Sequence, residues 1–180
     1  MYLRRAEMRD LPQIETIIQD GKELLRAQNI DQWQGNYPDT KVLVDDIQNG
    51  HTMVLVDHNE VLGTAAVIPA PDESYTGIDG EWLTKDDHYV SIHRVAVSAK
   101  HRGQGLSGKL FDAMFAEIDK AATVDGIRID THPQNKGMQH VIKKMGFTET
   151  GHVQVMTDGE NVTDFAYEKY NHQQVPAHVE

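Results

Sequence analysis

The segment from Val95 to Leu110 constrains the fold of this chain more than any other, because it joins a strand, a glycine-rich turn and a helix. Val95-Ala96-Val97 ends a run of strand-favouring residues, and Arg102-Gly103-Gln104-Gly105-Leu106-Ser107-Gly108 leads into an apolar helical pattern. The first turn of a helix has unpaired N–H groups at the positive end of the helix dipole, and glycine lets a backbone approach an anion closely. The segment therefore predicts an anion-binding turn.

Basic residues gather at this turn although the chain is acidic overall. Lys100, His101, Arg102 and Lys109 lie there, whereas the 180 residues together carry 17 basic and 28 acidic side chains, a net charge of −11. The local excess of positive charge favours a bound phosphate. The overall charge excludes nucleic acid as the main partner, because binding to a phosphate backbone needs a basic face. It is compatible with a cationic substrate.

Hydrophobic periodicity and turn residues predict a mixed order of helices and strands. Asp10 is expected to cap the first helix, and the polar stretch Pro69–Asp87 is either a functional lid or an insertion. The predicted strands are Tyr2–Ala6, Thr52–Val56, Val61–Ile68, Val90–Val97, Gly126–Thr131, Thr148–Thr157 and Asn161–Tyr170. The predicted helices are Leu11–Gln28, a short helix opened by Thr40 and ended by Asn49-Gly50, Leu106–Ala122 and Asn135–Met145.

Composition indicates one globular domain, which we place at residues 1–170 with a loose tail at 171–180. The absence of cysteine excludes disulfides, thiolate metal sites and a cysteine nucleophile. Ten histidines are present, but none has the spacing of a metal-binding motif, so no metal is expected. The chain has neither a secretory apolar region near Met1 nor an apolar run of membrane-spanning length, so we expect a cytoplasmic protein with no membrane partner.

The turn matches two sequence motifs, which bind different phosphate-containing ligands. Gly103 to Gly108 spells G-x-G-x-x-G, the dinucleotide fingerprint, and Asp130 ends the next strand at about the distance of its acidic partner. In that fold, however, the first glycine follows the strand almost immediately, whereas Ser98–Arg102 intervene here. The motif also follows antiparallel hairpins instead of opening a βαβ unit. The context therefore disfavours a nicotinamide cofactor.

The second match is Arg-x-x-Gly-x-Gly/Ala after a strand that ends in Val-Ala-Val. Arg102 to Ser107 fits this pattern, and Asn135 precedes a short helix that closes at Gly146-Phe147. Together with the element order over Tyr2–Tyr170, these motifs resemble the GNAT N-acetyltransferases. The resemblance implies an α/β (α+β) fold with a central mixed, mostly antiparallel sheet of about seven strands flanked by about four helices. It also implies acetyl-CoA as co-substrate, a small-molecule or peptide amine as acceptor, and a homodimer among the oligomeric states to be tested.

The resemblance implies a binding mode for the coenzyme. The strand before the turn pairs with the pantetheine arm as an added strand would, and splays away from Ile127–Asp130 to admit it. A backbone N–H near Val97 would stabilise the oxyanion. Asn135 would contact the pantetheine arm or shape the site. The residues expected to bind the coenzyme are Val95, Ala96, Val97, Arg102, Gly103, Gln104, Gly105, Leu106, Ser107, Gly108 and Asn135.

Three residues are candidates for proton transfer, in the order His93, His132 and Asp130. His93 lies four residues before Val97, on the same face of a strand by period-two alternation. Histidine titrates near neutrality, although a structural core histidine is the competing interpretation. His132 follows the strand at the expected splay, and Asp130 is either a substrate-facing carboxylate or a cap for the loop after it. Many family members carry a tyrosine where this chain has Ile142, so no donor for the leaving thiolate is assigned.

The loop between the first two helices carries Trp33 and Tyr37, which are either walls of an amine pocket or core side chains. The leading hypothesis is an acetyl-CoA-dependent N-acetyltransferase that uses direct attack by a primary amine in a ternary complex. Because Ile142 replaces the usual tyrosine, the alternative is a non-catalytic sensor or interaction module that binds CoA or acetyl-CoA.

Overall fold

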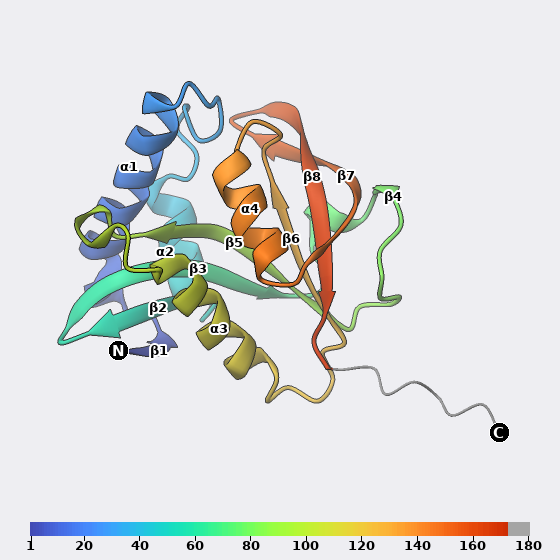
Figure 1. Cartoon of the computed structure of the whole chain (residues 1–180), viewed down its shortest axis with the longest axis horizontal. Coiled ribbons are helices and arrows are strands. Elements are labelled where there is room, and N and C mark those ends of the chain that lie inside the picture. Colours follow the sequence, from blue (N-terminus) through green and yellow to red (C-terminus); the bar gives the residue numbers. More distant parts are fainter. Residues whose placement is uncertain (173–180) are drawn as a thin grey trace.

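A single eight-stranded sheet runs through the computed structural model, which describes residues 1–172 (Figure 1). The strand order is β1-β2-β3-β5-β6-β8-β7-β4. The strands are β1 (Tyr2–Arg5), β2 (Thr52–Asp57), β3 (Glu60–Pro69), β4 (Asp79–Gly80), β5 (Tyr89–Val97), β6 (Gly126–Thr131), β7 (Thr148–Thr157) and β8 (Glu160–Tyr170). The α-helices are α1 (Leu11–Ala27), α2 (Thr40–Gln48), α3 (Leu106–Ile118) and α4 (Lys136–Lys144), and short 3₁₀ turns cover Met8–Asp10, Glu73–Tyr75 and Ala99–His101.

Neighbouring strands are antiparallel except for β5 and β6, which are parallel. A parallel pair needs a long crossover, and α3 supplies it. The mixed, mostly antiparallel sheet with helices on both sides confirms the predicted fold class, with one more strand than expected. The additional strand, β4, has two residues and pairs with Gly151 and His152 of β7. Two residues are too few to show any periodicity.

The helices cover opposite faces of the sheet, and each pair encloses its own core. Helices α1 and α2 pack on β2 and β3 through an aliphatic cluster that includes Ile14, Ile17 and Leu43. Helices α3 and α4 pack on the other face around Phe111 and Ile142. In Figure 1, α3 and α4 cross in front of the sheet and α2 lies behind it. Because both faces of the central strands are covered, β2 and β3 are buried along nearly their whole length.

Two local predictions are wrong. Helix α3 ends at Ile118, four residues before the predicted Ala122. The chain turns back there, and the Asn171 side chain donates a hydrogen bond to the Val124 carbonyl at 2.9 Å. Asp10 sits at the start of α1 but does not cap it, because its carboxylate binds Arg4 at 2.7 and 2.9 Å. Both partners lie outside the helix concerned, so the periodicity of the helix does not reveal them.

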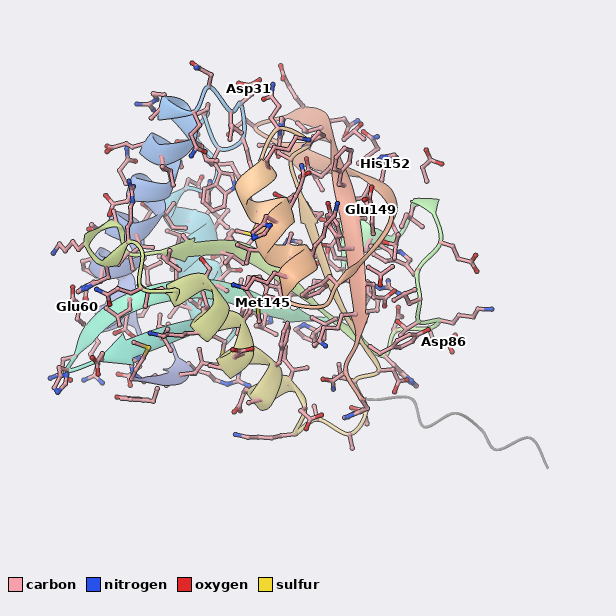
Figure 2. All side chains as sticks on the ribbon, in the orientation of Figure 1. Asp31, Glu60, Asp86, Met145, Glu149 and His152 are labelled. Carbon is pink, nitrogen blue, oxygen red and sulfur yellow. The ribbon has the colours of Figure 1, made fainter. Side chains whose placement is uncertain are left out.

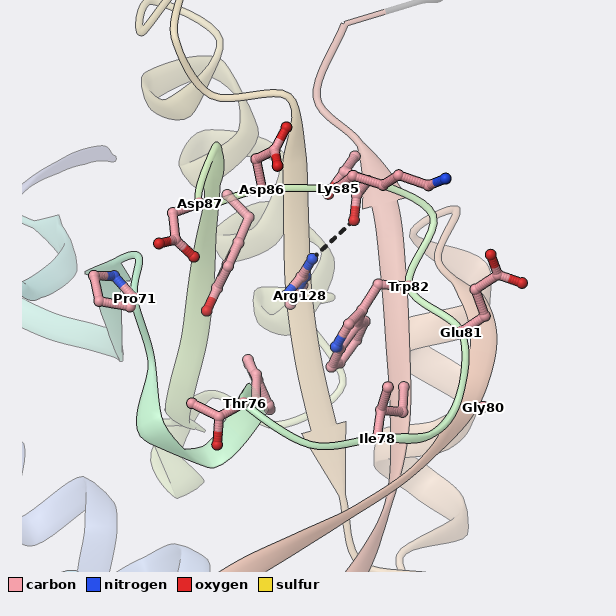
Figure 3. Close-up of a pocket in the computed structure, with 13 residues that line it drawn as sticks. Pro71, Thr76, Ile78, Gly80, Glu81, Trp82, Lys85, Asp86, Asp87 and Arg128 are labelled. Atoms are coloured by element: carbon pink, nitrogen blue, oxygen red, sulfur yellow. Dashed lines mark hydrogen bonds between the residues drawn. The ribbon is translucent and has the colours of Figure 1, made fainter.

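The segment between β3 and β5 is fixed to the sheet by buried charges. The Arg128 side chain of β6 lies between Trp82 and Tyr89, with its guanidinium carbon 4.3 and 3.7 Å from the two ring centres. Its Nη2 group donates to the Thr84 carbonyl at 3.0 Å (Figure 3). The fully buried Glu168 carboxylate accepts hydrogen bonds from Arg128 Nε at 3.1 Å and from the Leu83 N–H at 2.5 Å. These contacts hold the later part of the segment in place.

The predicted C-terminal tail lies mostly outside the described residues, from 173 onward. Of the described part, the Asn171 side chain binds Val124 and the His172 ring lies 3.0 Å from the Asp119 carboxylate. Within residues 1–172, none of the helices combines the length and apolar character needed to cross a bilayer.

Candidate active site

Strands β5 and β6 separate part-way along their length, as predicted. Their parallel pairing runs from Tyr89 opposite Gly126 to Ile92 opposite Ile129 and then stops. Beyond it, Ala96 and Val97 pair only with β3. A cavity of about 770 Å³ opens at the split and is lined by Val95, Ala96 and Val97. The free edge of β5 leaves backbone groups that an extended ligand can pair with.

The glycine-rich turn lies at one end of this cavity, which Ser107 also lines. Gly103 and Gly105 have φ angles of +78° and +67°, a left-handed conformation that glycine adopts without strain. A Cβ atom added at either glycine, or at Gly108, would meet no atom within 4 Å. The first hydrogen bond of α3 runs from the Lys109 N–H to the Gly105 carbonyl at 3.1 Å. The backbone N–H groups of residues 103–108 therefore have no acceptor within the described chain, and they can bind an anion.

A bulge in β5 changes which side chains share a face of this strand. On β3, Thr64 and Ala66 are two residues apart, whereas their pairing partners on β5, Ala96 and His93, are three residues apart. The extra residue is Arg94, whose φ angle is +53°. Consequently Val97 packs with Ile92 against the α3–α4 core. The prediction that His93 and Val97 share a face is wrong, because one added residue exchanges the two faces of a strand.

His93 nevertheless lines the cavity, and acidic groups lie on both sides of its ring. Its Nε2 atom is 2.6 Å from the Asp72 carboxylate and its Nδ1 atom is 3.9 Å from Asp130. The ring of Tyr75 stacks on it with centroids 5.5 Å apart. Burial opposes ionisation of Asp72, but His93 and the Ser74 N–H outweigh it and lower the pKa of Asp72 to about 2. An ionised Asp72 accepts a hydrogen bond from the Nε2–H group. The neutral imidazole therefore has its lone pair on Nδ1.

The other two candidates have different surroundings. The His132 Nδ1 atom accepts a hydrogen bond from the Gln134 N–H at 3.1 Å, so the neutral ring carries its hydrogen on Nε2 and has no free lone pair. Burial lowers the pKa of His132 below its ordinary value. Asp130 accepts a hydrogen bond from the Tyr75 hydroxyl at 2.5 Å. In the described chain no hydrogen bond joins Asp130 to residues 131–135, so the loop-cap interpretation is wrong.

Helix α4 presents apolar side chains to the cavity. Met138 and Val141 line it, whereas Ile142 is fully buried in the core beneath α3. Asn135 caps the helix, because its Oδ1 atom accepts from the Met138 N–H at 3.0 Å. Its Nδ2 group donates to Gln32 Oε1 at 2.7 Å, which ties α4 to the loop after α1. Asn135 therefore shapes the cavity from both sides, and α4 supplies no proton donor at Ile142.

The loop between α1 and α2 forms another wall. Trp33 lines the cavity and also packs on the α1–α2 core, so it is a core side chain, and its contact with an amine stays a prediction. The Tyr37 hydroxyl accepts a hydrogen bond from Arg94 Nη1 at 2.8 Å, and Arg94 binds Asp46 at 2.6 and 2.8 Å. Tyr37 is thus a fixed part of the wall. Asp31, labelled in Figure 2 on the loop after α1, is exposed at the rim.

Two cavity residues were missed in the sequence. Asp72 lies in the segment that has no helical or strand period, so no pattern could direct it to His93. Asp164 of β8 lies on the cavity wall and is 6% exposed. The strand period could have identified Asp164, because it alternates with Ala166 and Glu168 along β8 and shares their buried face. Among residues 1–172, no group of three or more potential ligand side chains is arranged to hold a metal ion.

The split between the parallel strands β5 and β6, with the glycine-rich turn beside it, suits an extended ligand that has an anionic end. Residues 18–147 match the acetyltransferase (GNAT) family, and the chain belongs to that family. Its members use acetyl-CoA as co-substrate, so this chain is by family an acetyltransferase.

Relatives agree with this assignment. The chain is 25% identical over 155 residues to the uncharacterized N-acetyltransferase YesJ of Bacillus subtilis (strain 168), covering 83% of each. It is 31% identical to an acetyltransferase of the GNAT family from Streptococcus agalactiae 2603, with a TM-score of 0.81 over 93% of this chain and 94% of that one. A ribosomal-protein-alanine N-acetyltransferase from Brucella melitensis shares the fold at 18% identity, with a TM-score of 0.65 over 94% and 99% of the two chains.

Proposed function

We propose that this protein transfers the acetyl group of acetyl-CoA to a primary amine of a small molecule or peptide, by direct attack within a ternary complex. The observation that carries the proposal is the split between β5 and β6, which leads from a turn with unpaired N–H groups to a cavity that contains His93. Acetyl-CoA supplies a thioester, whose carbonyl carbon accepts the amine nitrogen and whose carbon–sulfur bond then breaks. Without cysteine, the chain cannot form an acetyl-cysteine intermediate.

The coenzyme fits the residues present. The N–H groups of residues 103–108 bind the pyrophosphate, and the open space beside Gly103 and Gly105 accommodates it without a steric conflict. The unpaired edge of Val95–Val97 binds the pantetheine arm through backbone hydrogen bonds. Asn135 holds the opposite wall. A backbone N–H near Val97 stabilises the oxyanion that forms on the thioester carbonyl.

His93 is the proposed base. Its Nδ1 atom takes a proton from the reacting amine, while Asp72 holds the Nε2 hydrogen and stabilises the imidazolium that results. Asp72 is therefore a positioning residue. The competing base, His132, has its Nδ1 lone pair engaged by the Gln134 N–H. Residues 1–170 act as one domain in this proposal, and a cytoplasmic location and homodimerisation stay predictions.

The decisive test is binding of acetyl-CoA, measured by calorimetry. Gly105→Asp puts a carboxylate beside the pyrophosphate and should weaken binding at least about tenfold, since two negative charges about 4 Å apart repel by a few kcal/mol near a protein surface. Gly105→Asn is the matched control, because asparagine has the same shape and tolerates the same positive φ angle. NAD⁺ should not bind measurably. If wild type does not bind acetyl-CoA, the proposal fails; if the two variants bind equally, the turn is not the pyrophosphate site.

The alternative is a sensor that binds the coenzyme without turnover, and one observation favours it. The cavity face of α4 offers only the apolar Met138 and Val141 near the expected sulfur position, with no hydroxyl to protonate the thiolate. A free thiol has a pKa near 8.5, so a dedicated acid is not obligatory. Release of free coenzyme A thiol during incubation with a panel of primary amines separates the two functions. Sustained release of coenzyme A thiol with any amine would exclude the sensor function.

A further inference from the structure

The cavity wall is strongly acidic, beyond what an uncharged acceptor needs. Five carboxyl side chains line it: Asp31, Asp72, Glu73, Asp130 and Asp164. Among the described residues that line it, the single arginine is Arg94, and no lysine does. The Arg94 guanidinium donates to Asp46 and to the Tyr37 hydroxyl. The basic partner of the cavity carboxyl groups is His93, which lies 2.6 Å from Asp72 and 3.9 Å from Asp130. In the described part of the chain, no lysine or arginine side chain that lines the cavity pairs with Asp164.

Two of these carboxyl groups meet at the inner end of the wall, on the neighbouring strands β6 and β8. Asp130 is satisfied, because the Tyr75 hydroxyl donates to it at 2.5 Å. Asp164 is not, although it is only 6% exposed: its Oδ1 atom has no hydrogen-bond partner within residues 1–172. A buried carboxyl oxygen without a partner is costly, so Asp164 points to a ligand that completes it.

The electrostatics of the pair favour a cation. Burial and, after it, the neighbouring charge of Asp130 raise the pKa of Asp164 to about 8. Near neutral pH the two carboxyl groups therefore keep one proton, as close carboxylates do. A ligand ammonium can replace that proton and donate hydrogen bonds to the unpaired Asp164 oxygen and to Asp130. Burial and Asp130 raise the pKa of Tyr75 well above its ordinary value, so its hydroxyl stays a donor.

Resting on the proposed function, we infer that the acetyl acceptor carries a second cationic group, as an α,ω-diamine does, and that Asp164 and Asp130 bind this group. The reacting amine then lies beside His93, whose Nδ1 atom is 3.9 Å from Asp130. The wall thus orients a substrate with two amines so that one is held as an ammonium and the other is deprotonated for attack. A monoamine of the same length would leave Asp164 unpaired.

The test compares α,ω-diamines of two to eight carbons with n-alkyl monoamines of equal length, by release of coenzyme A thiol. Wild type should favour the best diamine by at least about tenfold in kcat/KM, the size of one charge-assisted contact. Asp164→Asn keeps the shape and removes the charge, so it should lose most of that preference, because kcat/KM for the diamine falls toward that of the monoamine. Asp112→Asn, an exposed acid on α3 outside the cavity, is the control for net charge.

Calorimetry with the same diamines in the presence of coenzyme A separates this inference from the proposed function. If wild type binds the diamine, Asp164→Asn does not, and no thiol is released, the cation site is supported and the proposed transferase activity is excluded. Turnover of monoamines at rates equal to diamines would keep the transferase and overturn the cation site. A diamine preference that survives in Asp164→Asn would also overturn it.

Discussion

At the scale of single residues, the chemistry depends on which nitrogen of His93 is free. Asp72 engages Nε2 at 2.6 Å, and the stacked ring of Tyr75 limits rotation of the imidazole. The lone pair of the neutral ring is therefore on Nδ1, toward Asp130 and the cavity. His132 has the opposite arrangement, because its Nδ1 is already an acceptor. Two histidines that look alike in the sequence differ in the one property that a base requires.

We predict that His93→Gln lowers kcat by about 10²–10⁴, the usual contribution of a general base, and removes the acidic limb of the pH–rate profile. Asp72→Asn should lower kcat by less, because the imidazolium loses its neighbouring negative charge while the base itself stays in place. Steady-state kinetics across pH with one good amine measures both effects.

His152→Gln is the control for this series, since His152 is half-buried on β7 and does not line the cavity (Figure 2). It should leave kcat and the profile unchanged. If His132→Gln lowers kcat strongly while His93→Gln keeps the wild-type kcat and pH–rate profile, the base is His132 instead.

At the scale of elements, the β5 bulge and the anchored segment before β5 bring the base and its partner together. Because of the bulge at Arg94, the side chains of His93 and Val97 lie on opposite faces of β5. The segment that carries Asp72 and Tyr75 is held at its far end by Glu168 and by Arg128, whose hydrogen bond to this segment is drawn in Figure 3. The sequence predicts either a functional lid or an insertion here, and these buried contacts disfavour a moving lid.

Glu168→Gln should lower the free energy of unfolding by about 3 kcal/mol or more, because it leaves the buried Arg128 guanidinium without a counter-charge. Urea denaturation measures the change. Glu149→Gln on β7, labelled in Figure 2, breaks an exposed pair with Lys143 at 3.8 Å and should cost less than about 0.5 kcal/mol. Equal small effects in both variants would contradict the anchoring role of Glu168.

At the scale of the whole molecule, the acidic pair that we assign to substrate makes the free fold sensitive to alkaline pH. Asp164 ionises near pH 3.8 in a model peptide and near pH 8 in the folded chain. Between these values the folded state binds more protons than the unfolded state. Raising the pH from about 4 to 8 therefore reduces stability through this group, and the loss is complete above pH 8.

Asp164→Asn should remove this dependence. We expect its melting temperature to exceed that of wild type by an increment that grows between pH 5 and pH 9, at about 2–4 °C for each kcal/mol in a chain of this size. Thermal unfolding without ligand measures it. Asp112→Asn should show no such growth, and a pH-independent difference for Asp164→Asn would contradict the raised pKa.

Most of the fold could be predicted from the sequence, because helices and strands longer than about five residues repeat their apolar positions with a fixed period. The glycine-rich turn could be predicted with the elements around it, since Gly103 and Gly105 mark positive φ angles in the chain itself. The errors lie where a partner outside the element decides: β4 exists only because β7 is beside it, and Asp10 binds Arg4 of β1 instead of its own helix.

The order of the longer elements, the turn that starts α3 and the resemblance to the family all follow from local sequence patterns. Which side chains meet in the cavity depends on the tertiary structure. One bulge residue exchanged the faces of β5, and the register of β6 and β8 brought Asp130 beside Asp164. Periodicity and turn preferences are properties of neighbouring residues, whereas a catalytic contact depends on register and on segments far apart in the chain, which no local pattern contains.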